Sequence, residues 1–156
     1  LAVERADAMK AQELANTLWA IVLLRDDVAM SDAAPDLIPK LTQVANENAP
    51  KWSPKEADIN LPMIACCLAK LDIQTQKPLL KTTVKCFKGK LGAMNDWGLC
   101  ALAWSFTEVF KDAEFGGFRA SLKAEVKQRG FSEKLVQRSQ MGPVDWRSCT
   151  VERLCS

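Results

Sequence analysis

The stretch "ELANTLWAIVLL" (residues 13–24) places leucine, isoleucine and valine at helical spacing around residues of a different character. Leu14 and Leu18 fall on one side of a helix, because residues four apart share a face. Asn16 and Trp19 interrupt the apolar run. This stretch is either a functional motif or one copy of a repeating structural unit, and the rest of the chain has to distinguish the two.

The same helical periodicity continues along most of the chain. Of 156 residues, 48% are apolar, which is enough to bury a core of one domain. Apolar residues recur three and four apart, and no segment alternates with a period of two, so we predict an all-α fold. We expect a helical domain over residues 1–139 and an irregular C-terminal tail over residues 140–156.

Start and stop signals divide this domain into helices. Ser53 to Glu56 reads "SPKE", with a Ser cap, a Pro at the first helical position and a Glu that closes a capping box. Pro62 is expected to kink or restart that helix. The first expected helix covers residues 3–25, the second runs from Ser31 or Asp32 to just before Pro50, and the third covers residues 53–71. The fourth runs from Lys77 to Gly89 or Gly92, and the fifth is capped by Asn95 or Asp96 and runs to residue 110. The sixth covers residues 118–130, and a short seventh follows Ser132.

An internal repeat appears when these helices are compared. An apolar helix alternates three times with a more polar helix rich in Lys and Gln. When Trp19 is aligned with Trp104, Leu14 is also aligned with Leu99. A middle copy has Met63 at the position of the tryptophan and Asn60 at the position of Asn16. The repeat period is about 41 to 44 residues. Helix pairs of this length bury their apolar faces by stacking. The sequence therefore predicts a short right-handed α-solenoid of about three helix-pair repeats, with these residues as packing positions.

"LANTLWA" (residues 14–20) resembles the first helix of the degenerate helix-pair repeats in octatricopeptide-type and RAP-domain-associated organellar proteins of algae and protists. "GLCALAWSF" (98–106) resembles a second copy, and "DINLPMIACCLAKL" (58–71) a third. The resemblance implies an α-solenoid imported into an organelle, a plastid rather than a mitochondrion, and action on organellar RNA. A targeting segment would precede Leu1 and is not expected within this chain.

The composition argues against catalysis. Histidine and tyrosine are absent, which removes the commonest general base and excludes Ser-His-Asp and Cys-His catalysis within this chain. We expect no enzyme, no cofactor and no metal site. The longest mostly apolar uncharged stretch, residues 59–69, is shorter than the roughly 20 residues that cross a bilayer. Peripheral association with a membrane complex remains open.

The cysteines do not form a ligand pattern, because no two are spaced C-x-x-C as zinc sites require. Four of them, Cys66, Cys67, Cys86 and Cys100, lie in apolar helical surroundings, where cysteine acts as a small hydrophobic residue. Cys149 and Cys155 in the tail are the candidate disulfide pair.

Charge is distributed unevenly, although the net charge is only +2. Residues 1–36 carry seven acids and three bases, whereas residues 73–95 carry five lysines and no acid: Lys77, Lys81, Lys85, Lys88 and Lys90. Four of these lysines recur at helical spacing and form a stripe that could bind phosphates, anionic lipid or an acidic protein. An ordinary solvated helix face explains the same pattern.

The tryptophans divide into two groups. Trp19 and Trp104 are expected to pack between helices, and Trp52 to pack ahead of the Ser53 cap as a hydrophobic staple. Trp97 and Trp146 are harder to bury within one chain, so they are the candidate partner contacts, since tryptophan is enriched at interfaces.

Two functions follow. The first is a non-catalytic scaffold or accessory subunit that docks onto a larger organellar assembly, such as a photosystem, a respiratory complex or a mitoribosome, with protein subunits as partners. The alternative is an organellar RNA-binding repeat protein that uses the lysine face.

Overall fold

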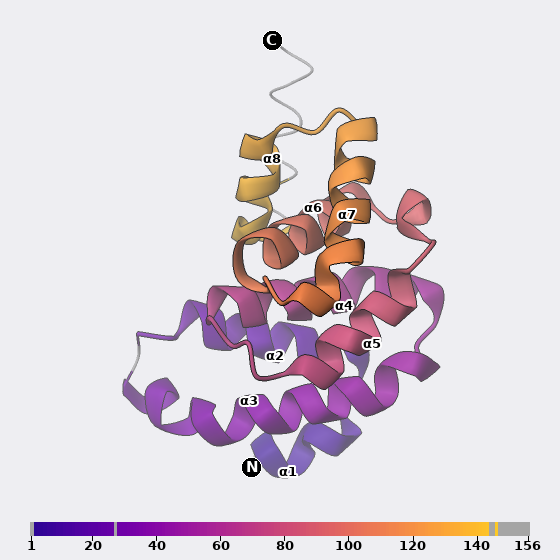
Figure 1. Ribbon diagram of the computed structural model, residues 1–156. Coiled ribbons are helices and arrows are strands. Elements are labelled where there is room, and N and C mark those ends of the chain that lie inside the picture. The colour runs from indigo at the N-terminus through magenta and orange to yellow at the C-terminus, as the bar shows by residue number, and fades with distance from the viewer. Residues whose placement is uncertain (1, 27, 144–145, 147–156) are drawn as a thin grey trace.

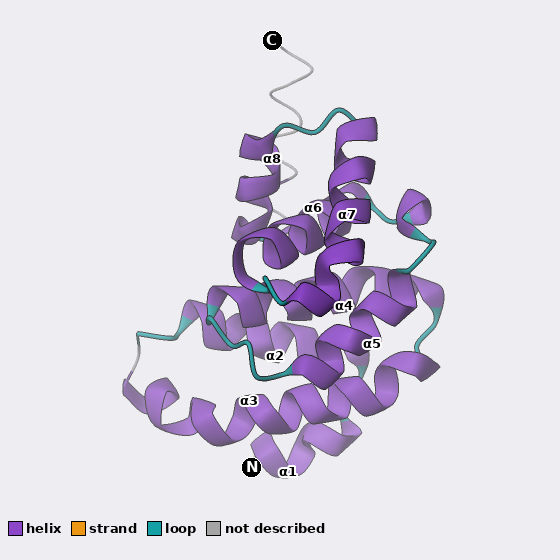
Figure 2. Cartoon of the chain, viewed as in Figure 1, coloured by secondary structure: helices purple, strands orange, loops and turns teal. Residues whose placement is uncertain are grey.

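The computed structural model describes residues 2–26, 28–143 and 146 (Figure 1). Helices and the loops that join them account for all of these residues, and no strand occurs among them (Figure 2). The predicted all-α class is therefore confirmed.

The described residues form eight α-helices, and short turns extend or separate them. The α-helices are α1 (Ala2–Arg5), α2 (Ala11–Leu23), α3 (Val28–Asn48), α4 (Pro54–Lys70), α5 (Lys77–Phe87), α6 (Asp96–Trp104), α7 (Gly116–Gln128) and α8 (Glu133–Arg138). A π-helical turn (Ser105–Val109) extends α6, and 3₁₀ turns occupy Ala6–Ala8, Ala49–Lys51, Leu91–Ala93, Ala113–Phe115 and Ser139–Met141.

The apolar helices α2, α4 and α6 pack in a row, with α4 in the middle. The helices that follow them, α3, α5 and α7, each pack against the helix that precedes them, and α5 also packs against α3. In Figure 1 the chain progresses from α1 at the bottom to α7 and α8 at the top. The buried apolar side chains form one continuous cluster from Ala6 to Trp146, so the described part of the chain has a single core.

Three predicted helix starts are confirmed by their hydrogen bonds. Ser53 Oγ accepts from the Glu56 N–H at 3.2 Å, and the Glu56 carboxylate accepts from the Ser53 N–H at 2.9 Å, which completes the capping box of α4. Asn95 Oδ1 caps α6 by accepting from the Gly98 N–H at 2.8 Å. Ser132 Oγ caps α8 by accepting from the Leu135 N–H at 3.2 Å.

Helix α6 approaches α4 closely where Gly98 faces the α4 backbone. A Cβ atom at this position would lie 3.2 Å from the Asp58 carbonyl oxygen. Asn95 Nδ2 donates to that same carbonyl at 3.1 Å and to the Asp58 carboxylate at 3.0 Å. The beginning of α6 is thus fixed to the side of α4.

Several predicted boundaries are wrong. The first helix does not run unbroken over residues 3–25, because Met9 and Lys10 adopt extended backbone between the Ala6–Ala8 turn and α2. The second helix begins at Val28, before the expected caps. Pro62 does not restart a helix, since α4 continues through it.

The described residues that follow α8 contact α6, α4 and α2. The Ser139–Met141 turn packs against α6. Lys70 Nζ at the end of α4 donates to the Gln140 carbonyl at 2.9 Å and lies 5.6 Å from the centroid of the Trp19 ring. Gly142, with φ of +99°, lies against Trp19, and a Cβ there would be 3.0 Å from Cζ2 of the indole. We call this contact between Gly142 and Trp19 the clasp.

Two further expectations from the sequence concern a disulfide and a membrane crossing. Cys149 and Cys155, the candidate disulfide pair, lie outside the described residues. Among the helices that are described, none combines the length and apolar character that a membrane crossing requires.

Candidate functional site

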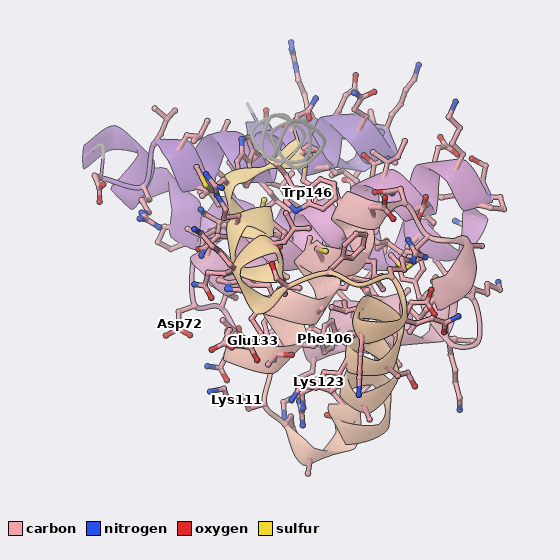
Figure 3. All side chains as sticks on the ribbon, turned by 90° about the horizontal axis from the view of Figure 1, so that it is seen from above. Asp72, Phe106, Lys111, Lys123, Glu133 and Trp146 are labelled. Atoms are coloured by element: carbon pink, nitrogen blue, oxygen red, sulfur yellow. The ribbon has the colours of Figure 1, made fainter. Side chains whose placement is uncertain are left out.

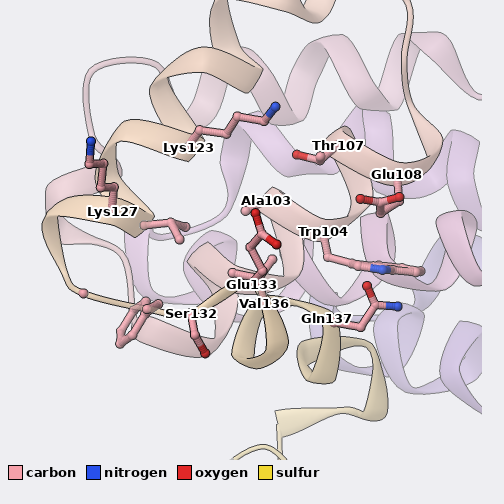
Figure 4. A pocket seen from close by; sticks show the side chains of 13 residues that line it. Ala103, Trp104, Thr107, Glu108, Lys123, Lys127, Ser132, Glu133, Val136 and Gln137 are labelled. Carbon is pink, nitrogen blue, oxygen red and sulfur yellow. The ribbon is translucent and has the colours of Figure 1, made fainter.

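A hollow with a volume of about 710 Å³ lies between α7 and α8 (Figure 4). Helix α6 packs against both of these helices and lies at the base of the groove. The apolar side chains of the groove come from three elements: Ala103 and Trp104 at the end of α6, Val126 of α7, Phe131 between the helices, and Val136 of α8. We call this hollow the α7/α8 groove.

Charged side chains line the two sides of the α7/α8 groove with opposite sign. Lys123 and Lys127 project from α7, whereas Glu133 begins α8 and Glu108 lies at the end of the turn that extends α6. All four are exposed. In Figure 4 the Lys123 side chain points toward Thr107. The groove therefore has an apolar base, a basic wall and an acidic wall.

Arg129 fixes the C-terminal end of α7, which forms the basic wall. Its guanidinium donates to the carbonyls of Leu91 and Met94 at 2.8 Å each, and to the Asp96 carboxylate at 2.8 Å. Its Nε donates to Glu125 Oε1 at 3.0 Å. The end of α7 is thus bonded to the loop that leads into α6.

Arg119 fixes the opposite end of α7 in a comparable way. Its Nη1 donates to the Phe110 carbonyl at 2.7 Å and to the Phe106 carbonyl at 3.3 Å, groups that the ending helix leaves without partners. The Phe106 ring packs edge-on against Phe110, Phe115 and Phe118, with centroids 5.2 to 5.4 Å apart. The basic wall is therefore held at both ends before any ligand binds.

The predicted lysine stripe is not a continuous free surface. Lys77 Nζ pairs with Asp112 at 2.5 Å and Lys81 Nζ with Glu114 at 3.1 Å, both in the loop before α7. The hydrogen bond from Lys77 lowers the pKa of the Asp112 carboxyl and raises the pKa of Lys77 itself. Lys85 is exposed on α5, whereas the two remaining lysines, Lys88 and Lys90, are exposed beyond the end of α5.

A second hollow, with a volume of about 450 Å³, combines an aromatic ring with basic side chains. It is lined by half-buried Trp52, by Phe87 at the end of α5, and by the exposed Lys55 and Lys90. We call it the Trp52 pocket. The sequence did not indicate it, because its two lysines lie far apart along the chain and only the fold brings them to one tryptophan.

Trp97 and Trp146 are not available as partner contacts. They are 6% and 5% exposed, respectively. Trp97 Nε1 donates to the Ser139 carbonyl at 2.9 Å, and Trp146 Nε1 donates to the Leu135 carbonyl at 3.2 Å. Figure 3 shows Trp146 well away from Lys123 and Glu133. The expectation that these tryptophans contact a partner is wrong, because the segment after α7 packs on α6, where it covers Trp97 and buries its own Trp146.

Most of the expected repeat positions lie in or against the core. Leu14 and Leu99 are fully buried, Trp104 is 7% exposed, and Trp19 and Met63 are half-buried against the core: these side chains do pack between elements.

The two asparagines of the expected repeat behave differently. Asn60 is buried, and its Nδ2 donates to the Glu56 carbonyl at 2.8 Å within α4. Asn16 is exposed, so its assignment as a packing position is wrong. The shared sequence position of Asn16 and Asn60 does not give them a shared environment.

The cysteines among the described residues are all free thiols. Cys66, Cys67 and Cys100 are buried. Burial raises the pKa of the Cys66 and Cys100 thiols to about 12, so these thiols stay protonated at neutral pH. Cys86 is half-buried beside the Trp52 pocket, and burial raises its pKa as well. Over the described ranges no three Cys, Asp or Glu side chains gather in a way that would hold a metal ion.

Comparison of the chain with models of protein families, with curated proteins and with solved structures gave no match. The function is therefore inferred from the side chains and their arrangement.

Proposed function

We propose that the chain is a non-catalytic helical-repeat scaffold or accessory subunit that docks onto a larger organellar assembly. The observation that carries the proposal is the row of α2, α4 and α6, each with a second helix packed against it. This arrangement supports a short right-handed α-solenoid of about three helix pairs. Stacked pairs of this kind create extended surfaces and grooves between elements, which suit the binding of other proteins.

The engagement of the charged side chains supports a structural role. Arg119 and Arg129 direct their guanidinium groups to backbone carbonyls, and Asp112 is paired with Lys77. The buried thiols of Cys66 and Cys100 have pKa values of about 12, which is far from what a nucleophile needs. These groups hold the fold together.

The organellar part of the proposal rests on the likeness of "LANTLWA" to the octatricopeptide-type motif. It favours a plastid over a mitochondrion. The partners are the protein subunits of a photosystem, a respiratory complex or a mitoribosome, and the association with a membrane complex would be peripheral.

The test is fractionation of the native protein by size under mild conditions. We expect it to migrate with an assembly much larger than its own 17.3 kDa. Recombinant protein run alone is the control and should migrate as a single chain. Native protein that migrates only as a free monomer would contradict the proposal.

RNA binding is the second candidate, and the Trp52 pocket favours it. Exposed aromatic rings beside lysines can stack a base and pair with a phosphate. The Trp52 pocket is lined by one half-buried indole and by two exposed lysines, Lys55 and Lys90. Asp58 also lines this pocket but is bonded to Asn95.

Binding to single-stranded RNA at several salt concentrations tests this candidate. If the Trp52 pocket binds RNA, affinity falls steeply with salt, and Lys55→Glu combined with Lys90→Glu lowers it by about tenfold or more. Lys123→Glu combined with Lys127→Glu is the matched control, because it reverses the same number of exposed charges outside the Trp52 pocket. Absence of salt-sensitive binding at micromolar protein removes RNA binding as a function.

A further inference from the structure

The fold already contains one groove between helices that a third helix fills. Helix α5 packs against both α3 and α4. Leu79, Leu80 and Phe87 are its buried apolar side chains. At the edge of the contact, Thr82 Oγ1 of α5 donates to Asn46 Oδ1 of α3 at 2.6 Å. An amphipathic helix with a polar edge therefore fits between the second helix of one pair and the first helix of the next.

By the order of the helices, the α7/α8 groove lies two helix pairs further along the chain than the groove that α5 fills. Helix α8 packs on α6, as α6 packs on α4. Each of these helices begins with a polar cap residue, Ser53, Asn95 or Ser132, whose side chain accepts from the N–H three residues later. Helix α8 thus corresponds to α4 and α7 to α3. No helix of the described residues occupies the place that corresponds to α5.

The described part of the chain turns away from this groove after α8. The Ser139–Met141 turn packs against α6, and Gly142 lies against Trp19 of α2. Trp146 packs against the ring of Phe131, with centroids 6.2 Å apart, and bonds to Leu135, but it does not line the groove. The base and both walls therefore stay accessible in the described structure.

We propose that the α7/α8 groove binds an amphipathic helix of a partner protein, in the position that α5 takes between α3 and α4. The inference rests on the proposed scaffold function and names its docking site. The apolar face of the partner helix lies over Trp104, Val126 and Val136. One flank is acidic and faces Lys123 and Lys127.

Charge complementarity defines the other flank and the orientation of the partner helix. Glu108 and Glu133 lie on the side of the groove opposite to α7, so the second flank is basic. Reversal of the helix in the groove would place like charges together, which is unfavourable. The groove therefore selects one direction of the bound helix.

Titration of the isotope-labelled full chain with designed helical peptides, followed by NMR, tests the proposal. The first peptide has a leucine face, one glutamate flank and one lysine flank, and the second has the same face with two lysine flanks. We expect the wild type to bind the mixed peptide about tenfold more tightly, a difference of about 1.4 kcal/mol. Shifts should centre on Trp104, Val126 and Val136.

The double variant Lys123→Glu and Lys127→Glu makes both walls acidic and should invert this preference. Both lysines are exposed, so folding should be unchanged, and a urea midpoint equal to that of the wild type verifies it. The control variant, Lys85→Glu with Lys88→Glu, changes the net charge by the same amount outside the groove. It should leave the preference for the mixed peptide intact. Equal binding of both peptides, no binding at millimolar peptide, shifts centred elsewhere, or dimerisation through this groove would each overturn the proposal.

Fractionation of the same double variant separates this inference from the proposed function. If the double variant is lost from the large assembly and the control variant is not, the result supports both the groove as the docking site and the scaffold function. An assembly that retains the double variant overturns the groove as the docking site and leaves the scaffold function standing. Wild-type protein that is only monomeric overturns the scaffold function itself.

Discussion

The side chain of Arg129 connects segments that are distant in the sequence. It leaves the end of α7, bonds to carbonyls of the loop before α6, and pairs with both Asp96 and Glu125. In the sequence it is only a basic residue in the last turn of a helix, where cations are common. Most of its partners lie more than 30 residues earlier in the chain, and only the fold brings the loop of residues 88–95 beside α7.

Replacement of Arg129 by Met should destabilise the fold by about 2–4 kcal/mol, because several hydrogen bonds to a charged group are lost and carbonyls are left without partners. Urea denaturation measures the change. Lys88→Met is the control, since Lys88 is exposed beyond the end of α5, and it should shift the midpoint very little. A shift for Arg129→Met no larger than that of the control would contradict the role of this side chain.

The buried thiols predict how stability depends on alkaline pH. In the unfolded chain a cysteine has a pKa near its ordinary value of 9.0, whereas burial raises the pKa of Cys66 and Cys100 to about 12. The folded state therefore keeps protons that the unfolded state loses. Stability should be fully present below pH 9 and should fall as the pH rises from 9 toward 12.

Urea midpoints measured from pH 7 to pH 11 test this dependence. Cys100→Ala removes one raised thiol and should give a shallower decline above pH 9 than the wild type, even if its stability at pH 7 is lower. Identical slopes for the two proteins would show that the thiol does not contribute.

At the scale of helices, local signals predicted the starts of α4, α6 and α8, because Ser53, Asn95 and Ser132 act through bonds within one turn. The break before α2 was missed. Lys10 occupies the cap position there without a side-chain acceptor, and only the bond from its N–H to Glu13 Oε2, at 2.7 Å, marks the start. The sequence thus predicted that these segments are helical and where a capped helix starts, but it did not predict a start that lacks a side-chain cap.

Two glycine substitutions should have opposite effects. Gly98→Ala places a Cβ 3.1 to 3.3 Å from Asn95 and from the α4 backbone, and it should cost about 1–3 kcal/mol by forcing α6 away from α4. Gly117→Ala meets nothing within 4 Å near the start of α7 and should stabilise by about 0.4–1 kcal/mol. Thermal unfolding of both variants gives the comparison. The same sign of change for both would contradict the close approach of α6 to α4.

At the scale of the whole molecule, the sequence predicted the order of the helices but not the hollows between them. The α7/α8 groove takes side chains from three helices, and the Trp52 pocket joins Trp52 to Lys90, so neither is visible as a local pattern. The lysine stripe was visible, but its partners Asp112 and Glu114 come from the loop before α7, and Asp112 follows Lys77 by 35 residues. Surfaces depend on contacts between distant segments, which periodicity does not contain.

The single core predicts cooperative unfolding. Tryptophans occur from α2 to the end of the described chain, and the apolar cluster is continuous between them. Urea transitions followed by tryptophan fluorescence and by far-ultraviolet circular dichroism should therefore coincide. Two separated transitions would mean that the first and last helices unfold independently.

The clasp has a consequence for how a protein of this kind can change in length. Where units contact only their neighbours, duplication of one unit leaves the others undisturbed. Here Gly142, which follows the last helices, touches Trp19 of the first apolar helix. Insertion of another helix pair between α4 and α6 would move these residues apart by about 8–10 Å, the spacing of packed helices. Growth by internal duplication would thus break the contact between Gly142 and Trp19.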